Sequence, residues 1–135
     1  MSKSLLYTVN DATQDVAIDG IINLGTIVRK FGQNLNLAGN GIQVCGPGYY
    51  EFDVSITLEP DAAGTVTVTG YENNVPIQGA VASNTVAAAA DPTNLSLDFV
   101  VRQFCSCCEG LSNITFKLSE NAATITNIAV VAEKL

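Results

Sequence analysis

Four cysteines are the residues of this chain that are best suited to metal or redox chemistry. Cys105, Cys107 and Cys108 form a dense cluster, and Cys45 lies far upstream. Together they could hold a metal ion through four thiolates. On an extended segment, however, the Cys-x-Cys-Cys spacing turns Cys108 away from Cys105 and Cys107. We therefore favour reduced thiols, or one disulfide between Cys45 and a cluster member, and expect neither a metal nor a cofactor.

Glu51 and Asp53 are a pair of neighbouring carboxylates that could take part in acid–base catalysis. They alternate with the apolar residues Tyr50, Phe52 and Val54, so we expect them on the solvent face of a strand. The chain contains no histidine, which excludes a Ser-His-Asp or Cys-His nucleophile. Its glycines are dispersed and form no phosphate-binding loop. We therefore expect no enzymatic activity and assign no catalytic residue.

The alternation of apolar and polar residues over 49–58 is the strongest structural pattern in the chain. Similar short runs continue to the C-terminus, separated by clusters of Gly, Asn, Asp and Pro. The predicted strands are 5–9, 21–24, 26–30, 34–37, 41–45, 49–58, 64–71, 75–81, 95–104, 113–118 and 125–133. Only 10–18 and 85–90 could form a helical turn, and the small side chains of 85–90 would also suit a strand that lies close against a neighbouring subunit. The pattern predicts an all-β protein: one antiparallel jelly-roll sandwich of about ten strands over 1–135, with room for a short irregular N-terminal arm over 1–20.

The same alternation predicts which side chains point into the core. The expected core residues are Phe52, Val54, Ile56, Val66, Val68, Leu97, Phe99, Phe116, Leu118, Ile128 and Val130. Glu51, Asp53, Thr67 and Lys117 are expected to point outward.

The composition favours a surface that is partly covered by another copy of the chain over an ordinary domain whose surface is rich in Thr, Asn and Ser. Hydrophobic residues make up 47% and charged residues 14%, with a mean hydropathy of +0.28. That leaves little charge for a surface that a domain of this size must expose. The net charge of −7 and the scattered basic residues argue against nucleic acid as a partner. No signal peptide and no membrane-spanning run are recognisable, so we expect synthesis in the cytoplasm and no membrane insertion.

A five-residue motif carries a resemblance to a known family. Gly48-Tyr49-Tyr50-Glu51-Phe52 fits the Gly-x-Tyr-x-Phe strand of the C1q/tumour-necrosis-factor-like jelly roll. Residues 73–80 and 125–135 are similar to a hairpin and the last strand of stand-alone phage and Firmicutes members, which are related to the C-terminal domains of collagen-like proteins. The resemblance covers about 5–135, although the chain has no collagen-like stalk. It implies a compact homotrimer packed around a threefold axis.

These observations favour a structural or interaction protein over an enzyme. The first hypothesis is a trimeric module that decorates a phage or prophage virion, as a head decoration or fibre head, and so resides in a virion or at an extracellular surface. The alternative is a bacterial surface or spore-coat module that binds protein or glycan through its loops. In either case Tyr49, Tyr50 and Phe52 are expected to serve the core and the subunit interface, not a ligand.

Overall fold

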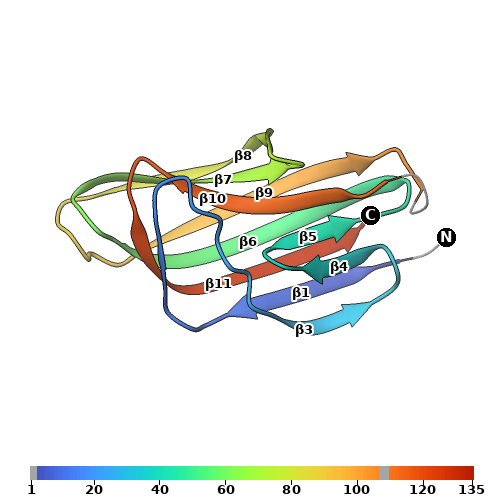
Figure 1. Cartoon of the computed structure of the whole chain (residues 1–135), viewed down its shortest axis with the longest axis horizontal. Coiled ribbons are helices and arrows are strands. Elements are labelled where there is room, and N and C mark those ends of the chain that lie inside the picture. Colours follow the sequence, from blue (N-terminus) through green and yellow to red (C-terminus); the bar gives the residue numbers. More distant parts are fainter. Residues whose placement is uncertain (1–2, 107–109) are drawn as a thin grey trace.

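The chain folds into two antiparallel β-sheets that face each other (Figure 1). The computed structural model describes residues 3–106 and 110–135. The six-stranded sheet contains β3 (Thr26–Phe31), β1 (Leu5–Asn10), β11 (Ala123–Lys134), β6 (Gly48–Pro60) and β9 (Thr93–Gln103) in that order, with β2 (Gln14–Val16) paired to β11. The five-stranded sheet contains β4 (Leu35–Ala38), β5 (Gly41–Val44), β10 (Ser112–Ser119), β7 (Gly64–Glu72) and β8 (Val75–Val86) in that order. The predicted jelly-roll sandwich is confirmed.

Strand β6 lies between β11 and β9 and pairs with both along almost its whole length. Its even-numbered side chains are buried from Tyr50 to Pro60, and its odd-numbered side chains face solvent. The alternation in the sequence therefore predicts correctly which side chains of β6 are buried and which face solvent. Because β-strand side chains point alternately to opposite faces, the pairing of β6 also fixes which face of its neighbours is buried.

The core lies between the two sheets and is joined by three phenylalanines. Phe52 and Phe99 stack at a ring-centroid distance of 5.1 Å, and Phe99 meets Phe116 of the opposite sheet at 6.1 Å. All eleven residues predicted for the core are buried. Asp53 is exposed, and Glu51, Thr67 and Lys117 are partly exposed, as predicted.

The Gly-x-Tyr-x-Phe motif has a structural role at the start of β6. The Tyr50 side chain is completely buried, and its hydroxyl lies 2.9 Å from the carbonyl oxygen of Cys45 and 2.8 Å from that of Gly46. Asn34 Nδ2 donates to the same Cys45 carbonyl at 2.8 Å. Gly46 has a φ of 92°, a conformation that favours glycine, and a Cβ there would lie 2.5 Å from Asn34 Nδ2. The tyrosine thus anchors the turn that leads into β6.

Three expectations about the N-terminal quarter were wrong. Residues 21–24 form no strand but a single bridge, between Ile21 and Lys117. The segment covers the part of β10 that β5 does not reach, and the Ile22 amide donates to the Phe116 carbonyl at 2.9 Å. Residues 10–18 contain β2, not a helical turn, because Gln14–Val16 pairs with the end of β11. The described residues 3–20 do not form the irregular arm expected over 1–20, since β1 pairs with β11 on one side and β3 on the other.

The alanine-rich segment 85–90 was the other candidate for a helical turn, and it is not one. Strand β8 runs through Thr85 to Val86, and the chain then turns, with Ala90 at a φ of 62°. Thr65 and Thr85 pair across β7 and β8, with their hydroxyl oxygens 2.9 Å apart. No helix among the described residues is long and apolar enough to cross a membrane.

Replacing Phe52 tests the core. Phe52→Ala removes a fully buried ring that stacks on Phe99, and we expect the free energy of unfolding to fall by about 3–5 kcal/mol. Chemical denaturation measures this loss. Ser83→Ala, on the exposed side of β8, is the control and should change stability by less than about 0.5 kcal/mol. A loss below about 1 kcal/mol for Phe52→Ala would mean that Phe52 is not a core residue.

Candidate interaction surface

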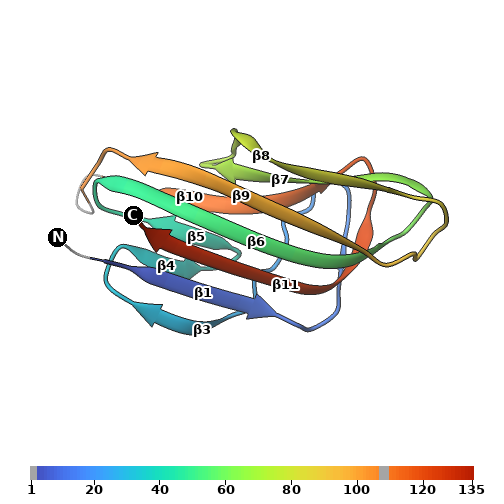
Figure 2. The same ribbon diagram turned by 180° about the vertical axis from the view of Figure 1, so that it is seen from behind.

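The candidate surface is the solvent-facing side of the six-stranded sheet, which we call the outer face (Figure 2). Strand register arranges its side chains in rows that cross β3, β1, β11, β6 and β9. One row consists of Arg29, Tyr7, Val131, Asp53 and Asp98, and the next of Phe31, Leu5, Glu133, Glu51 and Val100. Lys30, between Arg29 and Phe31, points the other way, since its Nζ donates to Asn36 of the second sheet at 3.0 Å.

An apolar patch lies in the middle of the outer face, where β1 pairs with β11. Its outward side chains, all partly buried, are Leu5, Tyr7, Val9, Ala129 and Val131. Tyr7 lies opposite Val131 and Val9 opposite Ala129. The residues between them, such as Leu6 and Val130, are fully buried in the core. Over this patch, which Glu133 bounds on β11, most side chains are apolar on both sides of the sheet, as is typical of strands covered on both sides.

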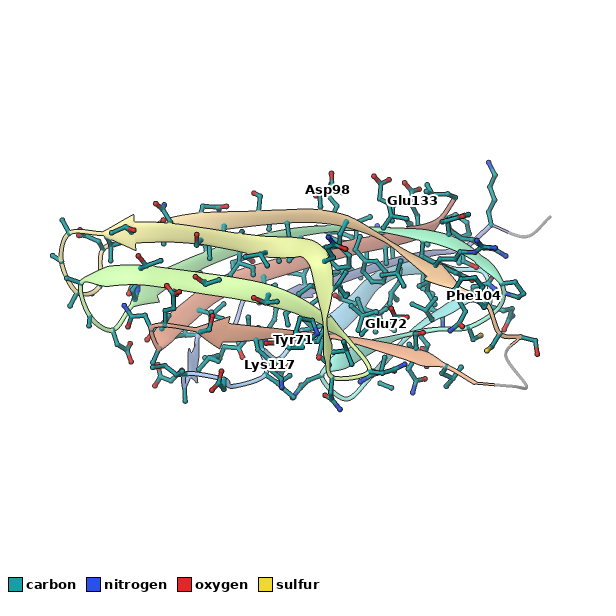
Figure 3. All side chains as sticks on the ribbon, turned by 90° about the horizontal axis from the view of Figure 1, so that it is seen from above. Tyr71, Glu72, Asp98, Phe104, Lys117 and Glu133 are labelled. Carbon is teal, nitrogen blue, oxygen red and sulfur yellow. The ribbon has the colours of Figure 1, made fainter. Side chains whose placement is uncertain are left out.

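The solvent-facing side of the five-stranded sheet is different. Thr65, Thr67 and Thr69 line β7 on that side. Lys117 Nζ lies 4.8 Å from the centre of the Tyr71 ring, and both residues are on this sheet (Figure 3). Hydroxyl groups and a lysine are compatible with water, and the large apolar side chains exposed on this sheet, Val75 and Val81, lie on its edge strand β8.

Four carboxylates gather on the β11, β6 and β9 part of the outer face, and we call them the acidic quartet. Glu51 lies opposite Glu133, and Asp53 lies opposite Asp98. Asp98 and Glu133 point away from the sandwich on the same side (Figure 3). Like charges directly opposite each other destabilise a sheet. Within residues 3–106 and 110–135, none of the four forms an ion pair.

The pKa of Glu51 lies above its ordinary value of 4.5. Burial of the carboxyl group contributes most, followed by the negative charges of Asp98, Glu133 and Asp53. The sequence correctly placed Glu51 and Asp53 on a solvent face. It offered no sign that Asp98 and Glu133 join them, because that depends on the pairing of three strands that are distant in sequence.

An arginine held between two aromatic rings lies at one end of the outer face. The guanidinium carbon of Arg102 is 5.1 Å from the centre of the Tyr49 ring and 4.4 Å from that of Phe104. Arg102 Nη1 also donates to the Tyr49 hydroxyl at 3.2 Å. Phe104 is 72% exposed and Tyr49 is 49% exposed. Tyr49 is therefore not a core residue of the chain, unlike Tyr50 and Phe52, and its role in an interface stays a prediction.

The structure favours one of the alternatives for the cysteines, a disulfide that includes Cys45. Cys45 is disulfide-bonded. Cys105 is a partly buried free thiol, and Cys107 and Cys108 lie outside the described residues. A sulfur in a disulfide is no thiolate ligand, so this arrangement favours the disulfide interpretation for Cys45. No group of three metal-binding side chains occurs in the described part of the chain.

Comparison with known proteins identifies the fold. No family model and no curated protein matches the chain. Murine APRIL at pH 5.0 matches with a TM-score of 0.76 and 15% identity, over 99% of this chain and 100% of that chain. The globular domain of zebrafish complement 1qA matches with a TM-score of 0.69 and 10% identity, over 97% and 95%. PRD1 vertex protein P5 matches with a TM-score of 0.59 and 13% identity, over 98% and 96%.

These matches agree with the Gly-x-Tyr-x-Phe motif. The chain has the tumour-necrosis-factor/C1q-like jelly-roll fold.

The raised pKa of Glu51 makes stability depend on pH. Between 4.5 and the higher pKa of the folded protein, the folded state binds more protons than the unfolded state, so stability falls as pH rises through this window. At pH 7 the charged carboxylate therefore destabilises the fold. We expect Glu51→Gln to raise the denaturation midpoint at pH 7 and to have little effect near pH 3, where the carboxyl group is protonated in both states.

Glu59→Gln is the matched control for this experiment. Glu59 lies on the same side of β6 but outside the quartet. Its replacement should raise the denaturation midpoint at pH 7 less than Glu51→Gln does. All variants are compared at one protein concentration. A lower midpoint for Glu51→Gln at pH 7, or an equal gain at both pH values, would contradict the proposed repulsion.

Proposed function

We propose that this protein is a non-enzymatic, self-associating jelly-roll module that acts as a homotrimer. The observation that carries this proposal is the contrast between the two solvent-facing sides of the sandwich. An apolar patch of Leu5, Tyr7, Val9, Ala129 and Val131 lies in the middle of the outer face, whereas the middle of the five-stranded sheet presents the threonines of β7 and Lys117 of β10. Burial of apolar side chains against another copy stabilises an assembly by roughly 25 cal/mol per Å² of apolar area.

A structural role also fits the rest of the surface. The described residues enclose no pocket and contain no cluster of metal-binding side chains. Binding sites for small molecules are normally concave. These observations therefore support a protein that acts by binding other proteins through its surface.

The assembly that we propose is a virion, of a phage or prophage, in which the trimer serves as a head decoration or fibre head. The likeness to PRD1 vertex protein P5 supports a virion as the first assembly to test. In this proposal the exposed Arg102, Tyr49 and Phe104 at one end of the outer face contact the capsid or fibre, because Arg and aromatic residues are enriched in protein interfaces. Capsid and portal genes beside the gene would support this assignment. Coat or collagen-like genes would support the alternative, a bacterial surface or spore-coat module that binds protein or glycan.

Light scattering tests the homotrimer. At micromolar concentration we expect about three chain masses of 14.1 kDa each. Val131→Asp places a charge in the apolar part of the outer face and should give a folded monomer. Thr67→Asp places the same charge on the outer side of the five-stranded sheet and should leave the trimer intact. A monodisperse monomer for the parent protein, or dissociation by Thr67→Asp alone, would overturn the proposal.

A further inference from the structure

One row of the outer face has opposite charges at its two ends. Strand β3, at one edge, presents Arg29, and neither β1 nor β3 contains an acidic residue. Strand β9, at the other edge, presents Asp98, which lies beside Asp53 of β6, and Arg102, which lies two rows further along beside Tyr49. Arg29 and Asp98 are both exposed. Neither forms an ion pair within residues 3–106 and 110–135.

Arg29 and Asp98 also belong to one row of the sheet. Arg29 lies opposite Tyr7, Tyr7 opposite Val131, Val131 opposite Asp53, and Asp53 opposite Asp98. Four strand-to-strand steps separate the two side chains, which amounts to roughly 19 Å. Because the Debye length is about 8 Å at physiological salt, the two charges hardly interact within one chain.

A ring of three copies brings opposite edges of this face together. In a cyclic trimer each contact is heterologous, so one side of a copy meets a different side of the next copy. Rotation about the threefold axis leaves the height of a residue along the axis unchanged. If the threefold axis runs parallel to the strands, all residues of one row lie at a similar height along the axis. A residue in one copy then meets residues of the same row in the next copy.

We propose that Arg29 of one copy pairs with Asp98 of the next copy, so that the β3 edge recognises the two neighbouring carboxylates, Asp98 and Asp53, at the β9 edge. This inference rests on the proposed homotrimer and adds its contact geometry. The pair fixes the register of the interface, since a shift by one row would place the exposed Phe31 at the height of Asp98. It also relieves part of the repulsion within the acidic quartet.

A double-mutant cycle tests the pairing. The variants are Arg29→Glu, Asp98→Arg and the double variant, which restores the net charge of −7. We expect each single reversal to raise the concentration of half-dissociation about tenfold or more, and the double variant to return to within about threefold of the parent. Analytical ultracentrifugation over a dilution series measures these concentrations. Circular dichroism establishes whether each variant is folded. We expect all three to fold, because Arg29 and Asp98 are both exposed.

The matched control is Glu72→Arg, which makes the same change in charge on the five-stranded sheet (Figure 3). Combined with Arg29→Glu it should restore nothing, because Glu72 lies outside the outer face. If the parent protein is a trimer but Asp98→Arg restores the assembly of Arg29→Glu no better than Glu72→Arg does, the pairing is wrong. The homotrimer would still hold. A parent protein that is monomeric throughout the series would overturn the homotrimer itself, and the pairing with it.

Discussion

The pairing of β6 with β11 on one side and β9 on the other is the constraint on which the rest of the structure depends. It commits Phe52 to the core and Glu51 to the outer face, and it imposes the same division on both neighbours. A shift of one residue in register would exchange the two faces. The phenylalanine cluster on one side and the acidic quartet on the other are thus two consequences of one alignment.

Much of the fold could be predicted because the sequence signals are local. Alternation identified β6 and its buried residues, and turn residues marked most strand ends. Other segments depend on distant partners. Ile22 and Leu24 are fully buried beside β10 although they form no strand, and Gln14–Val16 is a strand because β11 extends beyond β1 to reach it. Pattern alone cannot tell where a neighbouring strand will end.

The candidate surface was only partly predictable. Low charge indicated that an apolar face is covered, and Leu5, Tyr7 and Val9 could have located it, since they are apolar at positions that alternate with the buried Leu6 and Thr8. The acidic quartet could not be found in this way. It joins β6, β9 and β11, and only the register of the sheet brings those carboxylates together. In the proposed trimer, apolar area supplies the stability of the assembly and charge supplies its register.

Hydroxyl-radical footprinting, read out by mass spectrometry, tests most directly whether the outer face is buried between copies. Tyr7 on the outer face and Tyr71 on the five-stranded sheet are two partly exposed tyrosines on opposite sides of the sandwich. We expect Tyr7 to be labelled less in the parent protein than in the dissociated Val131→Asp variant, while labelling of Tyr71 is the same in both. Equal labelling of Tyr7 in both proteins, or protection of Tyr71 instead, would contradict a buried outer face.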